Sequence, residues 1–100
     1  MSTSVLDLPV DAIAALCRRY HVTELSIFGS ALRDDFRPDS DLDFLVSFEE
    51  DAPVGLFEYV ELQLALSDLL GRKVDLVSKD GLKPLIRDDV IASSRIVYAA

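Results

Sequence analysis

Three aspartates are the residues of this sequence whose types and spacing could do chemistry. Asp41 and Asp43 are one residue apart at the start of an apolar run, and Asp75 lies inside a second apolar run. Because side chains alternate across a strand, we expect Asp41 and Asp43 on one face and Leu42 and Phe44 in the core on the other. An Asp-x-Asp pair alone also fits a solvated face of an edge strand. A third carboxylate in an apolar strand, where burial without a partner is costly, favours a hard-oxygen site for Mg²⁺.

A Gly-Ser pair ends the strand that is expected just before the acidic one. Glycine lets the backbone approach a phosphate closely, and the Ser30 hydroxyl and a helix N-terminus can donate hydrogen bonds to it. Gly29 and Ser30 alone are a weak signal. Beside three carboxylates on one sheet face, they predict a nucleotide–magnesium site.

Alternating helical and extended segments must position these residues. We expect helices over 8–20, 31–34, 56–70 and 82–92, and strands over 25–28, 41–48, 74–77 and, as a short end, 95–98. Gly71 takes the position that commonly ends a helix. The alternation predicts one small domain over residues 1–100, of α/β (α+β) class, with a mixed sheet flanked by helices.

The composition restricts the partners and the compartment. The 100 residues include 10 Lys and Arg against 18 Asp and Glu, a formal net charge of -8. Such a chain is a poor general nucleic-acid binder, so a basic partner or a bridging cation fits better. No apolar run approaches the roughly 20 residues that span a bilayer, and no leader opens the chain, so we expect a cytoplasmic protein. Cys17 and Tyr59 are expected to be packing residues. Lys79 and Lys83 are expected to be solvated surface residues rather than to reach a nucleotide or a partner.

Two motifs together resemble a known signature. The run Gly29-Ser-Ala-Leu-Arg-Asp-Asp35, followed by Ser40-Asp-Leu-Asp43, is similar to that of the DNA polymerase beta-like nucleotidyltransferase superfamily. The run 71–77 and the helix after it extend the likeness to most of the chain. The branch that fits best is the minimal one, the MNT-type nucleotidyltransferases paired with HEPN toxins. The resemblance implies a polymerase beta-like nucleotidyltransferase fold.

One position departs from the pattern of that branch. After the Gly-Ser turn the family often has Ala-Arg-Gly, whereas this chain has Leu-Arg-Asp. Arg33 stays in register, and it would contact phosphate or pair with Asp34 or Asp35. Asp34 replaces a small glycine and changes the expected loop shape.

The resemblance implies a role for each site residue. Asp41 and Asp43 would hold two Mg²⁺ ions, and Asp75 would share the catalytic ion and help to deprotonate the acceptor hydroxyl. Gly29 and Ser30 would cradle the β and γ phosphates of the substrate ATP. One metal would activate the attacking oxygen while both neutralise the triphosphate.

The resemblance also implies the biological role. It points to an antitoxin enzyme that transfers AMP from ATP to a tyrosine hydroxyl of a cognate HEPN-type RNase toxin, in a hetero-complex. A chain of this length is not expected to carry an acceptor-binding domain of its own, and nucleic acid is not the expected substrate. Two alternatives stay open. One is a non-catalytic antitoxin that blocks the toxin by contact, at which Asp34 hints. The other is the catalytic subunit of a small-molecule, aminoglycoside-type nucleotidyltransferase.

Overall fold

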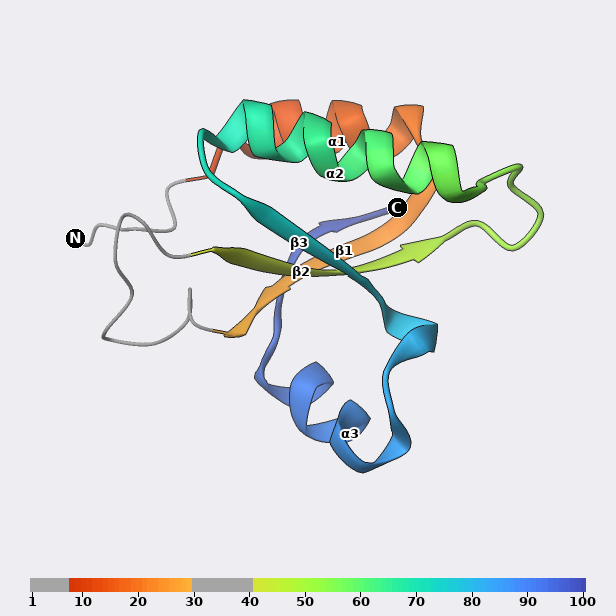
Figure 1. Cartoon of the computed structure of the whole chain (residues 1–100), viewed down its shortest axis with the longest axis vertical. Coiled ribbons are helices and arrows are strands. Elements are labelled where there is room, and N and C mark those ends of the chain that lie inside the picture. The colour runs from red at the N-terminus through yellow and green to blue at the C-terminus, as the bar shows by residue number, and fades with distance from the viewer. Residues whose placement is uncertain (1–7, 30–40) are drawn as a thin grey trace.

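The computed structural model describes residues 8–29 and 41–100 (Figure 1). In chain order its elements are α1 (Val10–Arg19), β1 (Val22–Phe28), β2 (Leu42–Phe48), α2 (Leu56–Leu70), β3 (Val74–Ser78), the 3₁₀ turn η2 (Lys79–Gly81), α3 (Pro84–Ser93) and β4 (Arg95–Ala99). The helix expected over 31–34 lies outside the described residues. Within the described part, no helix is both long and apolar enough to cross a membrane.

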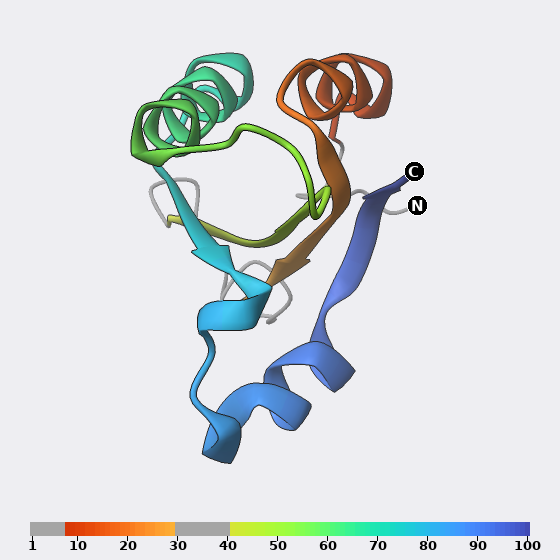
Figure 2. The same cartoon turned by 90° about the vertical axis from the view of Figure 1, so that its right-hand side faces the viewer.

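The strands form a mixed sheet with helices on both sides. Its order is β3-β2-β1-β4, in which β2 and β3 run parallel while β1 is antiparallel to both of its neighbours. Helices α1 and α2 lie side by side over one face, and α3 lies on the opposite side of the sheet (Figures 1 and 2). This arrangement confirms the predicted α/β domain with a mixed sheet flanked by helices.

The main core lies between the sheet and the helices α1 and α2. Leu42 and Phe44 of β2 are buried there, as predicted, against Leu62 and Leu66 of α2. Because alternate residues of a strand point to opposite faces, this burial turns Asp43 toward the other face of the sheet. The packing of the core thus decides where the acidic side chain points.

Side chains of α2 also form hydrogen bonds with the backbone groups at the outer edge of β3. The N–H of Val74 donates to Ser67 Oγ (3.0 Å), the N–H of Leu76 donates to Gln63 Oε1 (2.9 Å), and the Tyr59 hydroxyl donates to the Leu76 carbonyl (2.5 Å). Positions four apart on a helix rise about 6 Å, close to the roughly 6.6 Å between alternate strand residues. The helix therefore occupies an edge that would otherwise be open to another strand, and its rotation about its own axis is fixed.

Cys17 on α1 gives a direct test of this packing. The side chain is fully buried, as predicted, and burial raises the pKa of its thiol to about 11. Since the thiolate is the reactive form, we expect no reaction with an aromatic disulfide reagent at pH 8 in the native state, and complete reaction in denaturant. Labelling of the native protein at the rate of free cysteine would contradict the packing of α1.

Candidate functional site

Two of the three aspartates are neighbours across the parallel strand pair. In the register of β2 and β3, Asp43 is paired with Asp75, and Phe28 at the end of β1 is paired with Asp43 on its other side. Asp41 precedes β2 by one residue. Burial first, then repulsion from Asp75 and from Asp41, raises the pKa of the Asp43 carboxyl. The negative charges of Asp75 and Asp41 are therefore close enough to Asp43 to disfavour its ionised form.

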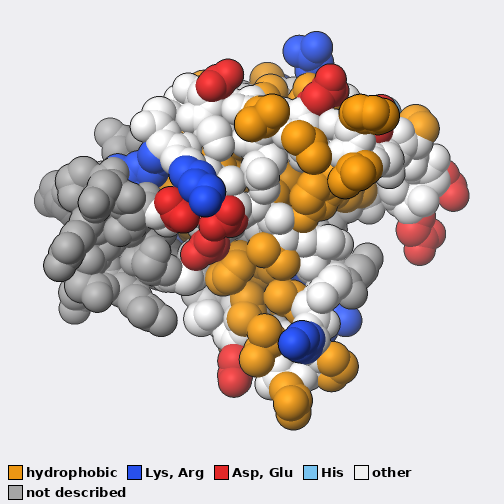
Figure 3. All heavy atoms as spheres, viewed as in Figure 1, with side chains coloured by type: hydrophobic (Ala, Val, Ile, Leu, Met, Phe, Trp, Pro, Cys, Tyr) orange, Lys and Arg blue, Asp and Glu red, His pale blue; other side chains and the backbone are white. Residues whose placement is uncertain are grey.

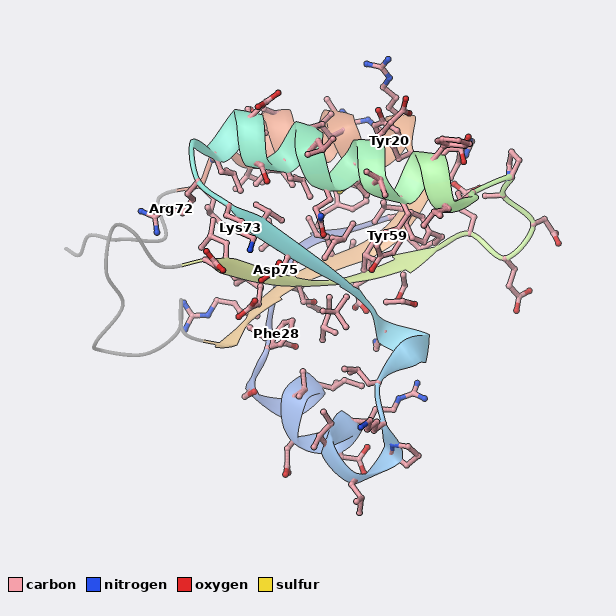
Figure 4. All side chains as sticks on the ribbon, in the orientation of Figure 1. Tyr20, Phe28, Tyr59, Arg72, Lys73 and Asp75 are labelled. Carbon is pink, nitrogen blue, oxygen red and sulfur yellow. The ribbon has the colours of Figure 1, made fainter. Side chains whose placement is uncertain are left out.

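Lys73 supplies a positive charge at this end of the sheet. Its ammonium nitrogen lies 3.9 Å from Asp41 Oδ2, and both side chains are well exposed, so the pair is weak. In Figure 4, Lys73, just before β3, and Asp75, near its start, lie at the same end of the strand. Figure 3 shows acidic side chains gathered around a basic one in this region. The spacing of two between Lys73 and Asp75 is the sequence signal that could have identified this lysine as part of the site.

The described carboxylates do not stand in the geometry of a metal-binding site. Among the described residues, no group of three His, Cys, Asp or Glu side chains stands in an arrangement that could hold a metal ion. Asp41 has Lys73 as a counterion, so a shared ion would have to replace that contact. The donor set nevertheless fits Mg²⁺, because it consists of hard carboxylate oxygens whose mutual repulsion a cation would relieve.

Gly29 packs directly against the acidic strand. Its φ is +78°, in the left-handed region, and a Cβ built on it would lie 2.5 Å from Asp43 Oδ2. The turn therefore requires glycine both for its backbone angle and for the space that the carboxylate fills. This contact brings the start of the Gly-Ser turn to Asp43. The other two predicted nucleotide-binding residues, Ser30 and Arg33, lie outside the described residues.

A partly buried ion pair lies farther along the same face of the sheet. Lys79 Nζ is 2.9 Å from Glu24 Oε1, and both side chains are about 30% exposed. The pair lines a pocket of about 140 Å³ with Ser26 and Leu45. The expectation that Lys79 is a solvated surface residue was therefore wrong. No local pattern indicated the pair, because its members meet only when the sheet has formed.

The structure is thus a small α/β domain whose mixed sheet has neighbouring aspartates at one end. Residues 11–97 match the family model described as Nucleotidyltransferase domain. The chain belongs to this nucleotidyltransferase family.

Relatives and solved structures extend the comparison. The protein adenylyltransferase MntA of Thermococcus cleftensis is 43% identical over 83 residues, which cover 83% of this chain and 80% of the relative. A solved minimal nucleotidyltransferase is 42% identical, with a TM-score of 0.72 over 85% of both chains. A complex of a tri-AMPylated HEPN toxin from Shewanella oneidensis with an MNT antitoxin contains a chain that is 19% identical. Its TM-score is 0.65, and the match covers 91% of this chain and 70% of that one, a likeness of fold.

Proposed function

We propose that this chain is a protein adenylyltransferase that acts as an antitoxin, transferring AMP from ATP to a tyrosine hydroxyl of a HEPN-type toxin. The observation that carries the proposal is the meeting of Asp43, Asp75 and Gly29: two acids lie beside the glycine at which the expected phosphate-binding turn begins. The name of the relative MntA and the AMPylated toxin in the Shewanella complex support the choice of donor and acceptor.

Asp41, Asp43 and Asp75 are the residues that would hold two Mg²⁺ ions. When bound, the ions neutralise the triphosphate and favour the ionised form of the attacking hydroxyl. The raised pKa of Asp43, which comes from burial and from its two acidic neighbours, supports this assignment because it shows negative charge that a cation would compensate.

The chain's own residues then position the reactants. The backbone of Gly29 leads the Gly-Ser turn to the carboxylates, so Ser30 would hold the β and γ phosphates while the α phosphate lies near Asp43. Asp75 accepts the proton of the tyrosine hydroxyl. The tyrosine oxygen bonds to the α phosphorus, the bond from that phosphorus to the bridging oxygen breaks, and pyrophosphate leaves with its electron pair.

The proposal is tested by mixing this protein with a purified HEPN-type toxin, ATP and Mg²⁺, and measuring the intact mass of the toxin. We expect a gain equal to one or more AMP groups, which peptide mapping places on tyrosine. Neutralisation of the toxin without any gain in mass would overturn the enzymatic proposal in favour of inhibition by contact. AMP transfer only to hydroxylated small molecules would overturn the assignment of a protein acceptor.

A further inference from the structure

Helix α2 presents an apolar face to solvent as well as to the core. Leu62 and Leu66 are buried under it, yet Leu56, Phe57 and Leu64 are 78%, 84% and 58% exposed. These three residues and the half-exposed Val60 recur at helical spacing on one side, which we call the outer face of α2. The hydrophobic side chains gathered over α2 are visible in Figure 3. Contiguous exposed apolar side chains of this size are uncommon on a monomeric protein and mark a surface that a partner covers.

The helix cannot turn to bury this face. Tyr59, Gln63 and Ser67 are hydrogen-bonded to the edge of β3, and rotation of α2 would break each of these bonds. The outer face is therefore a fixed surface, presented in one orientation. Preorganisation of this kind lowers the entropy cost of binding a partner.

A hollow adjoins the outer face at the start of the helix. It has a volume of about 460 Å³ and is lined mainly by apolar side chains, among them Phe48, Val54, Leu56 and Tyr59. Large apolar side chains of a partner could insert here, in the way that interface hot spots fill pockets. The hollow would hold an apolar side chain of the partner, and the outer face of α2 would supply the wider apolar contact around it.

The charge around this surface indicates what kind of protein covers it. Residues 49–71 contain six acids and no Lys, Arg or His; the acids are Glu49, Glu50, Asp51, Glu58, Glu61 and Asp68. Arg19 and His21 lie beside Glu58 and Glu61, and His21 is 3.9 Å from Glu49, but the six acids outnumber these two basic residues. A second copy of the chain would bring the same excess of negative charge against the first, and like charges facing each other across an interface cost free energy. The complementary partner is a protein with apolar side chains inside a basic rim.

We propose that the outer face of α2 is the docking surface for such a protein, which under the proposed function is the toxin. The identity of the partner rests on that function, whereas the docking surface rests on the exposed helix. Helix α2 is about 22 Å long, and the outer face includes the first residues of this helix. The aspartates lie near the start of β3, which follows the last residues of α2, so the far end of the docking surface is well separated from the acidic site. Docking should therefore govern the affinity for the partner and leave the chemical step unchanged.

The test compares two variants in which Glu replaces exposed apolar side chains, on α2 in one variant and on α3 in the other. Phe57→Glu/Leu64→Glu places acids on the outer face, and Leu85→Glu places one on α3 at a side chain that is 94% exposed. Binding to a purified HEPN-type toxin is measured by calorimetry, and AMP transfer by intact mass. For the α2 variant we expect Kd and KM to rise at least ~100-fold with kcat unchanged. For Leu85→Glu we expect wild-type values, and both variants should melt like the wild type because the replaced side chains are exposed.

Three other results are possible, and each would overturn a different part of the proposal. Wild-type binding by the α2 variant overturns the docking surface. A wild-type protein that is dimeric by light scattering, and that Phe57→Glu/Leu64→Glu makes monomeric, assigns the face to a second copy and overturns the heterologous partner. Wild-type protein that binds the toxin through α2 without transferring AMP leaves the docking surface standing and overturns the proposed function alone.

Discussion

Replacing Asp41 and Asp43 together with Asn is expected to lower the rate of AMP transfer at least ~1,000-fold while the domain stays folded. The amides remove two negative charges from the proposed metal site, and metal ions contribute several kcal/mol to the stabilisation of transition-state charge, each ~1.4 kcal/mol being tenfold in rate. Intact mass of the acceptor over time measures the loss. Asp88→Asn/Asp89→Asn, which changes two exposed acids on α3, is the matched control and should retain full activity.

The same double variant should be at least as stable as the wild type at pH 7 without Mg²⁺. Burial and the repulsion from Asp75 and Asp41 raise the pKa of Asp43 above its ordinary value of 3.8, so the folded state binds its proton more readily than the unfolded state does. The stability of the wild type therefore falls as the pH rises through the interval above 3.8, and Asn removes that penalty. At pH 3 the carboxyl is protonated in both states and the Asp43 contribution to the difference should vanish. Thermal melts at the two pH values measure this, and a variant that melts well below the wild type at pH 7 would show that the aspartates support the fold.

Replacing Gly29 with Ala is expected to slow AMP transfer ~100-fold and to destabilise the domain. The left-handed backbone costs a residue with a side chain about 1–2 kcal/mol. In addition, the new Cβ would lie 2.5 Å from Asp43 Oδ2, so the carboxylate must move, and a displacement of about 1 Å at a reacting centre can cost ~100-fold in rate. Steady-state rates and melting curves give the two effects separately.

Gly71→Ala separates the backbone cost of this substitution from its effect on the site. Gly71 ends α2 with a φ of +70°, but a Cβ on it meets nothing within 4 Å. It should therefore lose similar stability and keep its activity. Equal activity losses in Gly29→Ala and Gly71→Ala would show that the contact between Gly29 and Asp43 is not what matters.

The elements that the sequence predicted best are those with local signals. The helix expected over 56–70 is found as Leu56–Leu70, because a long apolar segment ends at a glycine that can take the left-handed conformation. Strand β1 begins at Val22, where a start at 25 was expected. The first residues of β1 are polar or lie close to the end of α1, so they give no local strand pattern. They are extended because they pair with β2 and β4; Glu24, for example, pairs with Ser47 on one side and with Ala99 on the other. Such partners are remote in the sequence and leave no local pattern.

The site shows the same division between local and long-range information. The period of two explains why Asp43 faces away from the core, and a carboxylate in an apolar strand drew attention to Asp75. That these two are direct neighbours depends on the register of β2 with β3, which the intervening helix α2 helps to set. The pair of Lys79 and Glu24 likewise joins segments 55 positions apart, and only the assembled sheet brings them together.

The most direct test of the central claim is a crystal structure with Mn²⁺ in place of Mg²⁺ and a non-hydrolysable ATP analogue. We predict anomalous density for the metal between the carboxylates of Asp41, Asp43 and Asp75, with Asp41 turned from Lys73 toward the ion and the triphosphate against the turn that begins at Gly29. A nucleotide bound with its phosphates elsewhere, or a metal held without Asp43 and Asp75, would contradict the assignment of these aspartates as the nucleotide–metal site.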